Sequence, residues 1–334
     1  MTPSPSAPSG NTDVGLVIIG RNEGERLRRC LLSSSEMTDR RVYVDSGSTD
    51  SSVDMATASG AGVVRLDMAQ PFTAARARNA GLNELRRSCP GVSKVQFIDG
   101  DCELIGDWLG KASSFMDAHA DVVAVAGRLR ERFPERSVFN RLCDIEWNTA
   151  VGEAKSFGGI VMIRLDALVR AGGFREELIA GEEPELSVRL RASGARLWRM
   201  DLDMAWHDAN ILKMSQWWRR TVRSGHAFAE GAALHGGPPE RHFVAETRRA
   251  LLWGAFLPLV VVLVAFYRPI GLLLLGVYIL QWLRLGLGLS RRGSPIPWAN
   301  AAFLLMGRFA EAQGALKFYL GRAFGRRSAL IEYK

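Results

Sequence analysis

An apolar stretch near the end of the chain restricts its fold more than any other feature. Across residues 251–283 the one charged side chain is Arg268. It separates two largely apolar arms, residues 251–267 and residues 270–289, of which the second extends past the stretch and includes Gln281 and Arg284. At about 1.5 Å per residue, each arm is close to the ~20 residues that cross a bilayer. The pattern predicts a membrane hairpin of two helices, with a buried helical hairpin in a soluble domain as the alternative.

Basic residues stand on both sides of this hairpin. They are Arg248 and Arg249 before it and Arg291 and Arg292 after it. The positive-inside rule places both flanks in the cytoplasm and Arg268 on the far side. This predicts a protein of the inner (cytoplasmic) membrane whose larger domain faces the cytoplasm. Residues 298–324 mix aromatic and basic side chains, which is typical of a helix lying along a membrane surface, although a third span starting at Ile296 stays open.

Composition excludes several classes of protein. With 47% hydrophobic and 23% charged residues, the chain is neither disordered nor of low complexity. Its net charge of +8 fits anionic lipid headgroups or a phosphorylated substrate, and no nucleic-acid-binding motif appears. The four cysteines have no CxxC spacing, so we expect neither a disulfide framework nor a zinc site. We expect the protein to reside in a reducing compartment. Residues 1–12 lack the features of a secretory signal and are expected to form a flexible tail.

The remainder, from Val14 to about Pro239, alternates short apolar runs with amphipathic segments. The runs that predict strands are residues 14–19, 42–44, 63–66, 95–98, 122–127 and 197–200. The segments that predict helices are residues 25–33, 50–59 and 74–87. This order is typical of an α/β domain with a mainly parallel sheet, which binds ligands at the carboxyl ends of its strands.

Polar residues follow several of these predicted strands. Glu23 comes after the first strand and Asp45 after the second, while Asp99 and Asp101 follow the fourth as a D-x-D pair. Carboxylates at strand ends can accept hydrogen bonds from ribose or a base, and hard divalent cations prefer such oxygen ligands. Taken singly, each motif is common in solvated turns and helix caps. The prediction of a binding site at these strand ends depends on the order and spacing of the motifs taken together.

This arrangement resembles the family 2 glycosyltransferases, which are inverting enzymes with the GT-A fold, a Rossmann-like nucleotide-sugar-binding domain. The resemblance covers the opening strand with Asn22-Glu23, the segment 44–50 in which Ser46 replaces the family's second aspartate, the Arg78-Asn79 helix start and the D-x-D motif. It implies a catalytic domain over residues 13–240, followed by a membrane-associated helical region over residues 241–334. It also implies that Glu23, Asp45, Arg78 and Asp99 bind the nucleotide sugar and that Asp101 binds a metal.

The second half of the domain extends the resemblance. Gly172-Gly173-Phe174 and the acidic segment from Gly181 to Leu186 are similar to the family's Gly-Gly-Phe and Glu-Asp-x-Asp-Leu region. The resemblance implies that Glu183 is the general base, with Glu182 as the near alternative and a helix N-terminus as the purely structural one. His207 resembles a metal-ligand histidine, and Gly159 would let the backbone approach the donor sugar.

A last motif resembles only part of the family pattern. Gln216-Trp217-Trp218-Arg219 fits the start of a Q-x-x-R-W motif, but Arg220 stands where the final Trp would be. Arg219 would act in catalysis on the departing diphosphate, Arg220 would bind the donor, and Trp217 or Trp218 would stack on a sugar. The alternative is a basic amphipathic helix at a membrane surface.

Together these features predict a hexosyltransferase-like enzyme of family 2. It would use Mn²⁺ or Mg²⁺, take a UDP-sugar as its donor and glycosylate a lipid or lipid-linked acceptor, because the hairpin holds the domain where lipid is concentrated. One alternative is an acceptor that is a growing exopolysaccharide. Another, from a different class, is a catalytically silent membrane scaffold that binds sugar nucleotides. The sequence leaves open whether the protein forms a homo-oligomer.

Overall fold

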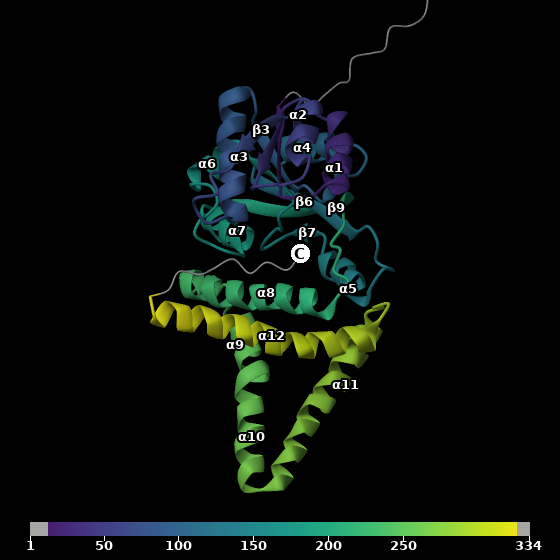
Figure 1. Cartoon of the computed structure of the whole chain (residues 1–334), viewed down its shortest axis with the longest axis vertical. Coiled ribbons are helices and arrows are strands. Elements are labelled where there is room, and N and C mark those ends of the chain that lie inside the picture. The colour runs from purple at the N-terminus through teal and green to yellow at the C-terminus, as the bar shows by residue number, and fades with distance from the viewer. Residues whose placement is uncertain (1–12, 326–334) are drawn as a thin grey trace, which may run out of the picture. The chain divides into compact units, whose positions relative to one another are not determined.

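A computed structural model describes residues 13–325 (Figure 1). The predicted tail, residues 1–12, lies outside the described residues. The chain divides into two compact units. The first unit comprises the chain up to Arg136, Glu146–Glu177 and Glu182–Asn210. The second comprises Ser137–Ile145, Leu178–Gly181 and the chain from Ile211 onward. The predicted boundary at residue 240 therefore falls later than Ile211, where the structure begins the main part of the second unit.

Within the described residues, nine strands form one sheet in the first unit, in the order β3-β2-β1-β4-β8-β6-β9-β5 with β7 paired to β9. The strands are β1 (Val14–Gly20), β2 (Arg41–Asp45), β3 (Gly62–Arg65), β4 (Lys94–Asp99), β5 (Cys102–Leu104), β6 (Val122–Glu131), β7 (Gly152–Glu153), β8 (Val161–Arg164) and β9 (Arg196–His207). Strands β3, β2, β1 and β4 pair in parallel, as does β6 with β9. The pairs β4–β8, β6–β8, β5–β9 and β7–β9 are antiparallel, so parallel pairing dominates only the first half.

Helices cover both faces of the parallel half because side chains of a strand alternate between its faces. On one face Val17 and Ile19 share a buried cluster with Leu82 of α3 (Ala74–Ser88). On the other, Ile18 packs in a cluster with side chains of α1 (Glu25–Ser35) and α4 (Trp108–Ala118). The helices predicted over residues 25–33, 50–59 and 74–87 are confirmed as α1, α2 (Ser52–Ala58) and α3. The parallel pairing of β1 with β2 and β4 brings the carboxyl ends of these three strands to one edge of the sheet.

Strand β9 is longer than the predicted strand at residues 197–200. It runs from Arg196 to His207 and pairs with β6 along most of that length, through several register irregularities. His207 is therefore the last residue of the strand and not part of a later loop. Three strand residues meet there, because His207 pairs with Glu131 of β6 and with Cys102 of β5.

The second unit is helical. Besides α5 (Val138–Trp147), of which Ser137–Ile145 belong to this unit, its elements are α8 (Met214–His235), α9 (Val244–Leu251), η1 (Leu252–Phe256), α10 (Leu257–Tyr267), η2 (Pro269–Leu275), α11 (Gly276–Arg291) and α12 (Pro297–Ala323). Helix α12 lies along α8 (Figure 1). Glycines permit this close approach, since a Cβ at Gly225 would collide with the backbone of Glu311 and one at Gly314 with the backbone of Val222. The packing against α12 explains why α8 groups with the second unit.

In the part of the chain that the structure describes, two helical segments are long and apolar enough to cross a membrane. They are Val244–Tyr267, with mean hydropathy 2.4, and Pro269–Arg291, with mean hydropathy 1.8. Both predicted arms lie within them, and α12 covers most of the predicted surface helix at residues 298–324. Large apolar side chains along the arms face outward, and Phe266 near the turn is 83% exposed. Aromatic contacts join the arms to α12: Trp282 Nε1 donates to the carbonyl of Trp298, which packs against Gly286.

Candidate functional site

The loops that follow β1 and β2 are tied together at the carboxyl edge of the sheet. The Asn22 amide oxygen accepts from the Thr49 backbone N–H at 2.7 Å, and the Asn22 N–H donates to Ser48 Oγ at 2.9 Å. Asn22 has a positive φ of 55°, which asparagine tolerates better than most residues. Gly24 N–H donates to Asp50 Oδ2 at 3.1 Å, so the Ser-Thr-Asp segment braces the first loop.

Asp45 uses its carboxylate to order its own loop. It accepts from the backbone N–H groups of Gly47 and Ser48, each at 3.1 Å, and the residue is only 4% exposed. Such contacts form a local turn. Glu23 lies over the D-x-D turn, where a Cβ at Gly100 would meet its Cγ at 3.3 Å, and it pairs with Arg26 at 2.7 Å. Contact of either carboxylate with a nucleotide stays a prediction.

Arg78 forms the centre of a buried ionic cluster. From α3 its guanidinium lies 3.1 Å from Asp99, 2.8 Å from Glu182 and 3.0 Å from Glu183. Phe174, of the Gly-Gly-Phe segment, lies 5.6 Å from the guanidinium carbon. Asn79 holds that segment in place, because its side chain accepts from the Phe174 N–H and donates to the Phe174 carbonyl. Arg78 and Glu182, which are 104 positions apart in the chain, thus meet in one ion pair.

Three carboxylates around one guanidinium leave an excess of negative charge. Burial raises the pKa of Glu183 to about 7, and repulsion from Glu182 adds to the effect while Arg78 partly offsets it. The two glutamates begin α7 (Glu182–Ala192), next to Gly181 with φ of +81°. The Glu183 side chain is 15% exposed and that of Glu182 only 3%. The raised pKa of Glu183 suits it for proton transfer, and its side chain is also more exposed than that of Glu182.

Gly159 closes over this cluster. A Cβ at this position would lie 2.5 Å from Arg78 Nη2, 3.0 Å from Glu183 Oε1 and 3.3 Å from Asp99 Oδ2. The adjacent Gly158 has no atom within 4 Å of an added Cβ. The sequence predicted that glycine at this position lets the donor sugar approach. The structure gives a second reason for glycine here, because the ionic cluster occupies the space that a side chain would need.

We expect Gly159→Ala to lower kcat/KM by about 10- to 100-fold, because the added methyl must displace Arg78 or Glu183 from a precisely packed site. Steady-state kinetics on the purified protein would measure this loss. Gly158→Ala is the matched control and should retain most activity. Equal losses in the two variants would contradict the packing argument.

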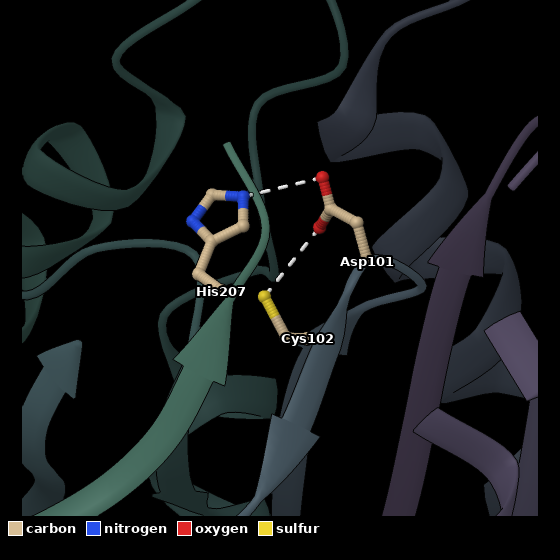
Figure 2. A group of neighbouring side chains, drawn as sticks. All are labelled: Asp101, Cys102 and His207. Carbon is tan, nitrogen blue, oxygen red and sulfur yellow. Dashed lines mark hydrogen bonds and ion pairs between the residues drawn. The ribbon is translucent and has the colours of Figure 1, made fainter. Parts of the chain in front are cut away.

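A second cluster contains Asp101, Cys102 and His207 (Figure 2). Asp101 Oδ2 lies 3.2 Å from His207 Nε2, and Cys102 Sγ donates to Asp101 Oδ1 at 3.4 Å. One potential ligand atom from each residue lies within 4.8 Å of the others. A carboxylate beside an imidazole suits a divalent ion such as Mn²⁺, so the predicted metal ligands Asp101 and His207 fit the group that the resemblance implies.

Backbone and ring contacts hold this second cluster in place. The Asp208 N–H donates to the Asp101 carbonyl at 3.1 Å. Trp147 stacks on the His207 ring with centroids 4.6 Å apart. Neither Trp147 nor Cys102 was predicted to be near the site. Cys102 follows Asp101 directly, which is a signal that the sequence did contain, whereas Trp147 gave none.

Arg219 and Arg220 lie on α8 in the second unit, and their predicted roles at the donor stay predictions. The Gln216 side chain accepts from the Leu212 and Lys213 N–H groups and so caps the start of α8. Trp217 is buried against Phe139 and Phe303, so its ring is used in packing and the predicted sugar stacking is wrong for this residue. Trp218 donates through Nε1 to Gln313.

Residues 16–154 match the sequence family described as "Glycosyl transferase family 2". A TPR repeat-containing protein of Synechococcus elongatus is 41% identical over 92 residues, which are 28% of this chain and 21% of the relative. The chain thus matches about a fifth of the length of that curated relative.

Solved structures give a comparison over most of the chain. The mannosyltransferase PcManGT from Pyrobaculum calidifontis, solved with GDP-mannose and Mn²⁺, is 18% identical with a TM-score of 0.57, covering 92% of this chain and 87% of that one. Residues 1–349 of TarS from Staphylococcus aureus are 14% identical with a TM-score of 0.48, covering 92% of each chain. The predicted GT-A-type α/β fold is confirmed.

Proposed function

This chain carries a family 2 glycosyltransferase domain over residues 16–154, and we propose that it transfers a sugar from a nucleotide-diphosphate donor to a lipid or lipid-linked acceptor, with inversion. The observation that carries the proposal is the cluster in which Arg78 meets Asp99, Glu182 and Glu183. It joins the strand end that carries the D-x-D motif to a carboxyl group of raised pKa.

In the proposed reaction Glu183 is the general base. Its carboxylate accepts the proton of the acceptor hydroxyl as that oxygen attacks the anomeric carbon, while the bond from this carbon to the diphosphate breaks. Arg78 and Glu182 position Glu183 through the ion pairs at 2.8 and 3.0 Å. Asp101 and His207 would hold a divalent ion, which when bound neutralises charge on the diphosphate. Asp99, Asp45 and Glu23 would bind the nucleotide sugar, for which we propose UDP as the nucleotide.

Membrane attachment is the second part of the proposal. It is supported by the outward-facing apolar arms and by the basic pairs Arg248–Arg249 and Arg291–Arg292 at their outer ends. We propose that the hairpin spans the inner membrane, that α12 lies at its cytoplasmic surface, and that the catalytic unit takes its acceptor from that surface. Arg219 and Arg220 on α8 would contribute positive charge for the departing diphosphate.

The test is nucleoside diphosphate release by the full chain in detergent, with UDP- and GDP-sugars, Mn²⁺ or Mg²⁺, and with or without membrane lipid extract. Release that depends on lipid supports the proposal. Release that depends only on an oligosaccharide supports the exopolysaccharide alternative, and binding without release supports a silent scaffold. Asp101→Ala should abolish release without unfolding the protein; unchanged release would contradict the assignment of the site.

A spanning hairpin can be tested separately by labelling its turn and its end from each side of the membrane. In a Cys89→Ser background, which removes the one cysteine that is not buried, a cysteine introduced by Arg268→Cys should react with a membrane-impermeant maleimide only from the non-cytoplasmic side. The control variant Arg291→Cys should react only from the cytoplasmic side, in inverted vesicles. Labelling of both from the same side would contradict a spanning hairpin and favour a re-entrant one.

A further inference from the structure

Cys102 takes no part in the reaction proposed above, yet its sulfur faces the two predicted metal ligands (Figure 2). We propose that Cys102 is a third protein ligand, so that the site binds its ion through oxygen, nitrogen and sulfur. Such a donor set prefers thiophilic divalent ions such as Co²⁺, Zn²⁺ and Cd²⁺ over Mg²⁺. The inference rests on the part of the proposed function that places a metal at Asp101 and His207.

The chain topology brings the three donors together. Cys102 is the first residue of β5 and pairs directly with His207, the last residue of β9. Asp101 precedes Cys102 in the turn from β4. The sulfur is thus held by the sheet itself and by its 3.4 Å contact with Asp101 Oδ1.

The spacing suits one ion. Three atoms within 4.8 Å of one another can all be reached from a point at most about 2.8 Å from each, and bonds of such ions to N, O and S are about 2.0–2.3 Å long. Closing that difference requires each side chain to move inward by about half an ångström, which is within ordinary side-chain adjustment. The Asp101–His207 separation of 3.2 Å already matches two ligands of one ion.

The site is enclosed on its protein side. Cys102 is fully buried and Asp101 nearly so, which keeps water from competing on the protein side of the ion. Coordination breaks the S–H bond and forms a sulfur–metal bond, and the proton leaves to solvent.

The experiment adds Co²⁺ alone to the full chain in detergent, without donor or acceptor, and records its absorption spectrum. We expect a sulfur-to-cobalt charge-transfer band in the wild type. Cys102→Ala and Cys102→Ser should lose the band and bind Cd²⁺ at least about tenfold more weakly. Cys143→Ala removes an equally buried thiol of the second unit and should keep the band. The ¹¹³Cd chemical shift of the wild type reports sulfur ligation even where a variant fails to fold.

The possible results distinguish sulfur ligation by Cys102 from metal binding at Asp101 and His207. Co²⁺ that binds without a charge-transfer band, or a band that persists in Cys102→Ala, overturns the sulfur ligand and leaves Asp101 and His207 in place. Absence of any Co²⁺ binding, with His207→Ala indistinguishable from wild type, overturns the metal site as a whole. A band that also disappears in His207→Ala supports a single ion shared by the two residues.

Discussion

Replacing Glu183 by Gln is expected to lower kcat by about 10²- to 10⁴-fold, because Gln keeps the shape of the side chain but cannot accept the acceptor proton. The affinity for the nucleotide sugar should change little. Initial rates of nucleoside diphosphate release and the Kd of the donor would measure the two effects. Glu182→Gln is the matched control, because it alters the neighbouring carboxylate that is more deeply buried. A larger loss of kcat in Glu182→Gln would assign the base to Glu182.

The pH profile gives a second view of the same residue. Since the base acts in its ionised form and its pKa is raised to about 7, kcat/KM should rise with pH up to about 7 and level off above it. A carboxyl pKa that is raised by folding contributes stability below its ordinary value near 4.5, and this contribution is lost as the pH rises through about 7. The difference in unfolding free energy between wild type and Glu183→Gln should therefore shift across that window. A pH-independent difference would contradict the raised pKa.

Removing the guanidinium in Arg78→Met is expected to destabilise the protein by about 3–5 kcal/mol near pH 8, because it leaves buried carboxylates without their cation. Asp99, Glu182 and Glu183 would then face one another across the space of the lost side chain. Activity should fall by more than about 10²-fold, since Glu183 loses both its orientation and the positive charge that limits its pKa. Denaturant unfolding and release assays measure the two losses.

The pH dependence identifies the cause of that destabilisation. At pH 5 Glu183, whose pKa is raised to about 7, is protonated and no longer repels its neighbours, so the loss of stability should be clearly smaller than at pH 8. Arg87→Ala is the control, because Arg87 lies on the same helix, is 75% exposed and pairs with Glu84 at the surface. It should change the stability by less than about 1 kcal/mol. An Arg78→Met penalty that does not depend on pH would indicate lost packing and not unpaired charge.

Much of the fold was predictable because local patterns agree with tertiary contacts there. The short apolar runs of β1, β2 and β4 are buried on both faces, and the amphipathic stretches of α3 and α1 each bury one face in the cluster on their own side of the sheet. The later strands were harder to predict. Strand β9 reaches His207 through irregular pairing with β6, and that pairing cannot be inferred from the residues of β9 alone. Helix α8 was assigned to the first domain because its packing against α12 leaves no mark in its own sequence.

The sequence by itself determined the class of the protein: strand-end motifs, an acidic pair and an apolar hairpin are local patterns whose meaning depends on residue type and spacing. Only the tertiary structure decided which of these residues share a site. Arg78, Asp99, Gly159 and Glu183 come together because parallel strands end at one edge and α7 begins beside it. The same applies to Cys102, whose sulfur lies within 4.8 Å of a ligand atom of His207 only because β5 and β9 pair. Electrostatic effects such as the raised pKa of Glu183 depend on burial and on neighbours distant in the chain, which no local pattern encodes.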